Sequence, residues 1–76
     1  MAFQVAEVYA WHGNTDKAYE WLDIAYKQRD GGFVQILLDP FLVSIHDDPR
    51  WEKVLDKVGL LTYWRELQAK QGEVNS

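Results

Sequence analysis

The feature that most constrains the fold is a helical spacing of apolar residues that occurs twice in the first 30 residues. It runs through Ala2, Val5, Ala6, Tyr9 and Ala10, and again through Ala18, Trp21, Leu22, Ala25 and Tyr26. Both sets follow the i, i+3, i+4, i+7, i+8 pattern that marks one face of an α-helix. Gly13 and Asn14 lie between them and are typical of a helix stop followed by an N-cap. The sequence therefore predicts an antiparallel helical hairpin over residues 2–29.

Two Asp-Pro steps punctuate the rest of the chain, Asp39-Pro40 and Asp48-Pro49. Each combines a capping carboxylate with a proline that suits the first helical position, so each predicts a helix start. The apolar segment 33–38 before them has no clean period; we expect a short helix there, although an extended segment also fits.

The second Asp-Pro step opens a longer amphipathic segment. Trp51, Val54, Leu55 and Val58 are spaced as one helical face, and Gly59 is expected to end that helix. Thr62 is then expected to cap a last helix through Trp64 and Leu67, and no strand pattern competes.

These patterns predict one all-α domain, with a hairpin over residues 1–30, short capping helices over residues 31–71 and a loose tail at 72–76. A chain of 76 residues buries only about 60% of the surface that its unfolded form exposes. Four Trp, four Tyr and three Phe are more large side chains than so small a body readily hides. Some of them are therefore expected to face a partner.

Charge and composition exclude several classes of function. The formal net charge is −4, with 12 acidic and 8 basic residues and no basic cluster, so direct binding of nucleic acid is not expected. The sequence has no apolar run long enough to span a membrane and no secretory signal pattern, which makes a cytoplasmic setting the expectation. The chain contains no Cys, so disulfides and thiolate metal sites are excluded.

The residues that could carry chemistry have simpler structural explanations. Asp48 is explained as a helix cap and Asp47 as a second acid near the same helix start. His12 and His46 are far apart in the sequence and show no metal-ligand spacing. We therefore expect no catalysis, no metal and no cofactor. The alternative is a small helical enzyme or ligand-binding protein with a polar pocket lined by Asp39, His46, Asp47 and Asp48.

The first 30 residues resemble one tetratricopeptide (TPR) repeat, a helical-hairpin unit of about 34 residues. The resemblance is carried by Ala2, Val5-Ala6 and Tyr9 in the first block, Gly13 in the turn, and Ala18, Leu22 and Ala25 in the second block. It departs from the family pattern at Ala2, where Trp is frequent, and at Asp30, where Pro would close the unit. No second copy of the pattern follows.

The remainder resembles the ending of many bacterial TPR-containing regulators. This likeness is carried by Asp39-Pro40-Phe41, Asp47-Asp48-Pro49-Arg50-Trp51 and Val58-Gly59-Leu60. In such proteins the segment closes a TPR array attached to an output domain. The resemblance implies a piece of an α-α superhelix that acts as a non-catalytic scaffold in regulation or signalling.

The resemblance also implies a binding surface on the first helix. Phe3, Glu7 and Trp11 occupy inner-surface positions of the family and lie at i, i+4, i+8, which makes them one stripe. This stripe is expected to bind a protein or peptide segment, or a second copy of the chain. Alternatively, Phe3 and Trp11 pack against a preceding repeat or the C-terminal cap. Because Phe3 and Glu7 replace clamp residues that hold acidic peptide ends in some relatives, an apolar or basic segment is the expected ligand.

Overall fold

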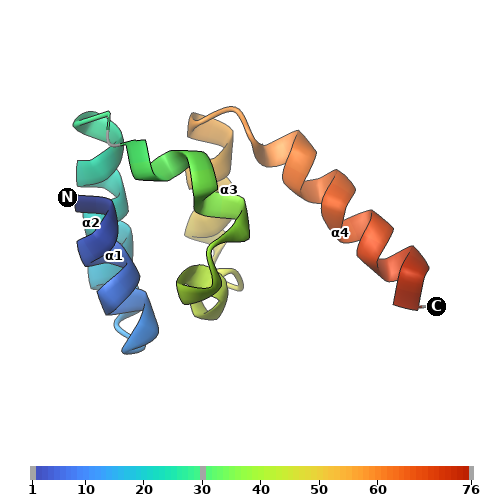
Figure 1. Ribbon diagram of the computed structural model, residues 1–76, viewed down its shortest axis with the longest axis horizontal. Helices are drawn as coiled ribbons and strands as arrows, with labels where there is room; N and C mark the ends of the chain where they lie inside the picture. The colour runs from blue at the N-terminus through green and yellow to red at the C-terminus, as the bar shows by residue number, and fades with distance from the viewer. Residues whose placement is uncertain (1, 30, 76) are drawn as a thin grey trace.

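The computed structural model describes residues 2–29 and 31–75, and over these ranges the protein is all-helical (Figure 1). Its elements are α1 (Ala2–Trp11), α2 (Thr15–Lys27), the 3₁₀ helices η1 (Gly31–Leu38) and η2 (Pro40–Ile45), α3 (Pro49–Lys57) and α4 (Leu61–Asn75). The all-α prediction is confirmed, and the described ranges contain no strand. Met1, Asp30 and Ser76, which the predicted boundaries included, lie outside the described residues.

Helices α1 and α2 form the antiparallel hairpin predicted from the apolar spacing. Alanines on both helices are completely buried where the two axes approach, namely Ala6, Ala10, Ala18 and Ala25. Small side chains at a helix contact allow this close approach. In the turn, Gly13 has φ +81°, and the N–H of Lys17 donates to Asn14 Oδ1 at 3.2 Å. Both turn residues therefore play their predicted roles.

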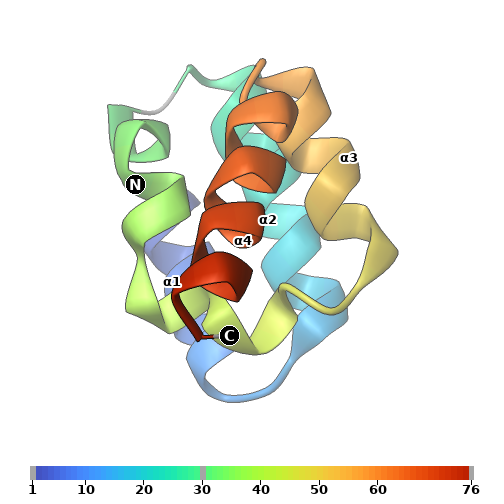
Figure 2. The same ribbon diagram turned by 90° about the vertical axis from the view of Figure 1, so that its right-hand side faces the viewer.

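The 3₁₀ helices pack against α1 of the hairpin, and Figure 2 shows the molecule turned by 90°, with α4 in front. Ile36, Leu42 and Ile45 of these helices are buried. The Tyr19 hydroxyl reaches across from α2 and donates to the Ile45 carbonyl at 2.6 Å. Asp39 Oδ1 accepts from the Phe41 N–H at 2.9 Å, so it caps η2 as predicted. The short helix expected around residues 33–38 is confirmed.

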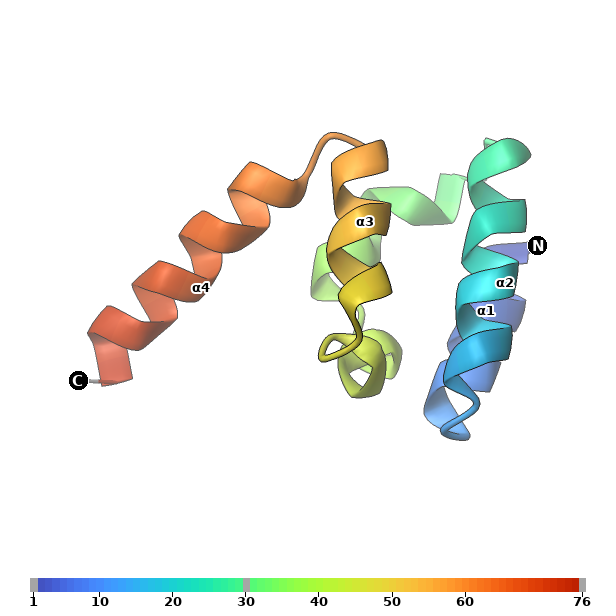
Figure 3. The ribbon, with the colours of Figure 1, turned by 180° about the vertical axis from the view of Figure 1, so that it is seen from behind.

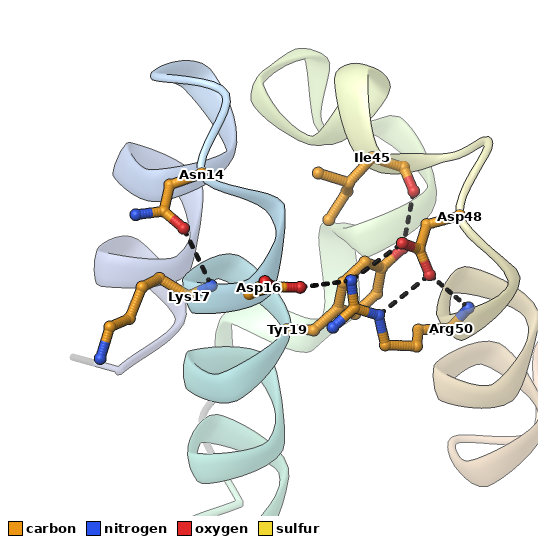
Figure 4. Close-up of polar contacts among 7 residues, drawn as sticks. All are labelled: Asn14, Asp16, Lys17, Tyr19, Ile45, Asp48 and Arg50. Atoms are coloured by element: carbon orange, nitrogen blue, oxygen red, sulfur yellow. Dashed lines mark hydrogen bonds and ion pairs between the residues drawn. The ribbon is translucent and has the colours of Figure 1, made fainter.

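Helix α3 begins at the second Asp-Pro step, where Asp48 Oδ1 accepts from the Arg50 N–H at 2.8 Å. The Arg50 side chain ties α3 to the hairpin (Figure 4): Nη2 contacts Asp16 Oδ1 and Asp48 Oδ2, both at 2.9 Å. Its guanidinium also lies 4.7 Å from the centre of the Tyr19 ring. Trp51 is fully buried on the inner face of α3.

Helix α4 leads away from the rest of the molecule (Figures 1 and 3). It begins at Leu61, and the Trp64 N–H donates to the Leu60 carbonyl, so the predicted cap at Thr62 is wrong. Its backbone stays helical to Asn75, where the sequence predicted a loose tail from residue 72. One glycine inside a helix costs only about 1 kcal/mol, which does not end it. No helix in the described ranges is long and apolar enough to cross a membrane.

Candidate functional site

Trp11 and Phe41 form an exposed aromatic pair between the end of α1 and the first turn of η2. Their side chains are 66% and 45% exposed, and their rings meet edge to face with centroids 5.4 Å apart. Val8 and Val43 are also exposed. A protein this small rarely leaves adjacent large apolar side chains uncovered unless they meet a partner.

Two shallow hollows flank this aromatic pair. One, of about 280 Å³, is lined by Gln4, Glu7, Val8, Trp11, His12 and Phe41. The other, of about 320 Å³, is lined by Trp11, Pro40, Phe41, Val43 and Ser44. Because both are walled by Trp11 and Phe41, we treat them together as the Trp11 groove. Ser44 Oγ donates to the Ala10 carbonyl at 2.8 Å, which fixes η2 against the end of α1.

The structure brings two members of the predicted stripe into this groove and removes the third. Glu7 and Trp11 both line it. Phe3 is only 1% exposed, with its ring 5.2 Å from that of Phe33 on η1. The prediction of an exposed Phe3 is therefore wrong, because η1 covers the first turn of α1. For Phe3, the alternative of packing against the cap is correct.

The predicted stripe did not include Phe41, which forms the second aromatic wall of the groove. In the sequence, Phe41, Leu42 and Ile45 all follow the first Asp-Pro step, and their apolar character alone does not separate Phe41 from the other two. In a 3₁₀ helix, side chains three residues apart share a face, so Leu42 and Ile45 point the same way and Phe41 points elsewhere. A period of three rather than 3.6 was the signal that could have placed Phe41 on the surface.

A pair of carboxyl groups lies beside the aromatic pair. Asp39 is only 6% exposed, and among the described residues no N–H or hydroxyl group donates to its buried Oδ2. Glu7 interacts directly with Asp39, and its pKa is raised to about 7 by burial first, then by a hydrogen bond to Asp39 and by the charge of Asp39. A hydrogen bond between two carboxyl groups requires one of them to be protonated. The pair therefore retains a proton close to neutral pH.

His12 closes the end of α1 beside the groove. Its Nδ1 lies 2.8 Å from the Val8 carbonyl oxygen. A carbonyl oxygen can only accept, so Nδ1 carries the hydrogen in this contact. His12 therefore follows directly on Trp11, the last residue of α1.

The four residues of the alternative polar pocket are not brought together. Asp48 is occupied by the α3 cap and by Arg50, and Asp39 caps η2. His46 stacks on Trp51 with ring centroids 4.1 Å apart, and burial lowers its pKa. Only His46 and Asp47 line the same hollow, against Trp64 of α4. Among the described side chains, no three acidic, His or Cys groups are placed to hold a metal.

A second apolar surface lies between η1 and α4. It is a hollow of about 530 Å³ lined by Leu37, Leu38, Trp64, Leu67 and polar residues of α4. Leu38 is 82% exposed at its edge. This second surface lacks the paired aromatic walls of the Trp11 groove, so the Trp11 groove is the better-defined site.

Comparison of the chain with models of protein families, with curated proteins and with solved structures finds no match.

Proposed function

We propose that this protein is a non-catalytic interaction module whose Trp11 groove binds a segment of another protein. The observation that carries the proposal is the exposed Trp11–Phe41 pair with a hollow on each side. Tryptophan is among the residues that most often dominate the energy of protein interfaces. A second copy of the chain would be one such partner.

The resemblance to TPR proteins supplies a context for this role. We propose that the hairpin is the last unit of a TPR superhelix in a cytoplasmic bacterial regulatory or signalling protein. A helical-repeat unit cannot bury its apolar face alone and needs neighbours or a cap. Here η1, η2 and α3 cover one side of the hairpin, and its opposite side lies at the end of the molecule (Figure 1). A preceding repeat would stack on that open side.

Selection from a random peptide library displayed on phage tests the binding role. The wild-type chain should enrich a set of related sequences, and Trp11→Ala should bind them at least about tenfold more weakly, as expected for an interface hot spot. Tyr63→Ala is the matched control, because Tyr63 is an exposed aromatic residue on α4, away from the groove. It should bind the selected peptides as the wild type does.

Two results would contradict the proposal. One is a selection that enriches no related sequences on the wild-type chain. The other is a set of peptides whose binding is unchanged by Trp11→Ala or is lost equally in Tyr63→Ala. Circular dichroism of each variant would show that the loss reflects binding and not unfolding.

A further inference from the structure

We propose that the Trp11 groove recognises a lysine or arginine side chain in the bound segment, and that this cation pairs with the Glu7 carboxylate, next to the buried Asp39. This inference depends on the proposed function, because it specifies what the same groove binds. It follows from the charge, the burial and the aromatic surroundings of the carboxyl pair.

Among the described residues, no cationic side chain contributes to the pKa shift of Glu7. The first basic residue in the sequence is Lys17, and neither η1 nor η2 contains an ionisable side chain. Glu7 and His12 are the only ionisable residues that line the groove. Charged groups of α2 form ion pairs elsewhere, in the contacts Lys17–Glu20, Lys27–Asp23 and Asp16–Arg50. The groove is therefore acidic and open to a basic partner.

Because Asp39 is buried, a nearby cation has a large stabilising effect on the two carboxylates. A buried carboxylate is costly unless it is paired or hydrogen-bonded. Asp39 Oδ1 has the Phe41 N–H as its donor, but no N–H or hydroxyl group of the described residues donates to its buried Oδ2. An ammonium or guanidinium group beside Glu7 would stabilise both carboxylates, and charge-assisted hydrogen bonds are about twice as strong as neutral ones.

The aromatic walls favour a cation over a neutral polar group. A cationic side chain is attracted to the face of a Trp or Phe ring, and its methylene stem covers apolar surface. The molecule already combines a carboxylate and a ring in this way twice. Arg50 contacts Asp16 and lies 4.7 Å from the Tyr19 ring centre. Lys57 contacts Asp23 and lies 5.1 Å from that of Tyr26.

Binding of the cation is linked to loss of the shared proton. The pKa of Glu7 is about 7 in the free protein, so a cation that prefers the fully ionised pair binds more tightly as pH rises from 6 to 8. The titratable groups that face the pair are Asp39 itself and His12 on the same helix, which lines the groove beside Glu7. A His12 variant must therefore accompany any pH experiment.

Two synthetic peptides test the inference on the intact chain. One is acetyl-Ala-Leu-Lys-Leu-Ala-amide, and the other has norleucine, an uncharged isostere, in place of lysine. In NMR titrations at pH 8 the lysine peptide should bind about tenfold more tightly, the size expected for a partly buried ionic hydrogen bond. At pH 6 this preference should shrink to about threefold or less, because the pair regains its proton.

Variants of Glu7 and His12 separate the contributions of these two residues to peptide binding. Glu7→Gln should abolish the preference for the lysine peptide over the norleucine peptide, and the pH dependence of that preference. His12→Gln should keep the lysine preference and the pH dependence of that preference. In the wild-type chain, the carboxyl ¹³C resonance of Glu7 should titrate at lower pH when the lysine peptide is present. This last measurement needs no variant and therefore holds even if Glu7→Gln fails to fold.

The two levels of the proposal fail differently. Equal binding of both peptides at pH 8, or a Glu7 resonance unmoved by the lysine peptide, overturns the inference and leaves the docking groove intact. A pH dependence that persists in Glu7→Gln and disappears in His12→Gln also overturns it. Failure of both peptides to bind, together with an unsuccessful phage selection, overturns the docking groove as well.

Discussion

Asp39 is the one charged side chain buried among the described residues, and its surroundings explain the unusual behaviour of Glu7. Helix capping holds Asp39 in place through the Phe41 N–H. Glu7 on α1 then meets a carboxylate that cannot move away or become solvated. The interaction between Glu7 and Asp39 could not be predicted from the sequence, because it depends on how η2 crosses α1.

This arrangement predicts that Glu7→Gln stabilises the protein above neutral pH. The pKa of Glu7 is raised to about 7 in the folded state, so the folded chain keeps a proton that the unfolded chain releases at lower pH. The contribution of Glu7 to the stability of the wild type then falls as pH rises from about 4.5 through 7. A glutamine cannot ionise and can donate an N–H to Asp39. In urea denaturation at pH 8, the free energy of unfolding of Glu7→Gln should exceed that of the wild type by about 1 to 2 kcal/mol. At pH 5 the two proteins should differ little.

Glu66→Gln is the matched control, because Glu66 is an exposed glutamate on α4. It should change stability equally at both pH values. If Glu7→Gln behaves in the same way, or is less stable than the wild type at pH 8, the carboxyl pair does not hold a proton as described.

Individual side chains were predictable only where a single face of a helix is buried. The apolar spacing correctly placed Ala6, Ala18 and Leu22 in the core. It omitted Tyr19, which is 6% exposed because η2 approaches α2 from a second direction and accepts the Tyr19 hydrogen bond at Ile45. It also left open whether Phe3 faces a partner or the C-terminal cap, since a periodicity does not show which later element covers a second face.

Helix starts that depend on local chemistry were predicted well. Asn14, Asp39 and Asp48 each accept a hydrogen bond from a backbone N–H at the start of a helix. Helix ends were less predictable. Gly13 and Gly59 take positive φ as expected, but Arg29 also adopts φ +54°, shortly after α2 ends at Lys27. A non-glycine residue in that conformation leaves little signal in a sequence.

The α3 cap predicts that Asp48→Ala destabilises the protein at neutral pH. The variant loses both the bond to the Arg50 N–H and the contacts with the Arg50 side chain. From typical losses of N-caps in domains of this size, the melting temperature should fall by about 4 to 8 °C. Asp47→Ala is the control, because Asp47 is the exposed neighbour and should change the melting temperature little.

The effect of Asp48 should depend on pH in a defined direction. Hydrogen bonds from the Arg50 side chain and N–H lower the pKa of Asp48 to about 2. Because its pKa is lowered, Asp48 stabilises the folded protein at pH values above the ordinary pKa of aspartate. This stabilisation is lost as the pH falls toward 2. The difference in melting temperature between the wild type and Asp48→Ala should therefore become smaller at acidic pH. A difference that widens there, or an equal loss in Asp47→Ala, would contradict the cap assignment.

At the scale of the whole molecule, the groove exists because distant segments meet. The 3₁₀ helices fold back along α1 and are fixed there by the bond from Ser44 to Ala10. Sequence spacing identified Trp11 and Glu7 on one helix face, but it could not show that Phe41 completes the wall. It also could not show that α4 departs from the body and contacts it through Trp64, which lies 5.6 Å from Trp51 ring to ring.

The four tryptophans allow the central claim to be tested in one spectrum. Trp11 lies in the groove, Trp51 in the core, Trp64 on α4 and Trp21 on α2. Each indole N–H gives one ¹H–¹⁵N NMR signal, which Trp→Phe variants would assign. When the acetyl-Ala-Leu-Lys-Leu-Ala-amide peptide is added at pH 8, we predict that the Trp11 signal moves in a saturable way and the other three stay in place. Movement of the Trp64 signal with Trp11 unchanged, or no movement of any signal, would contradict a docking groove at Trp11.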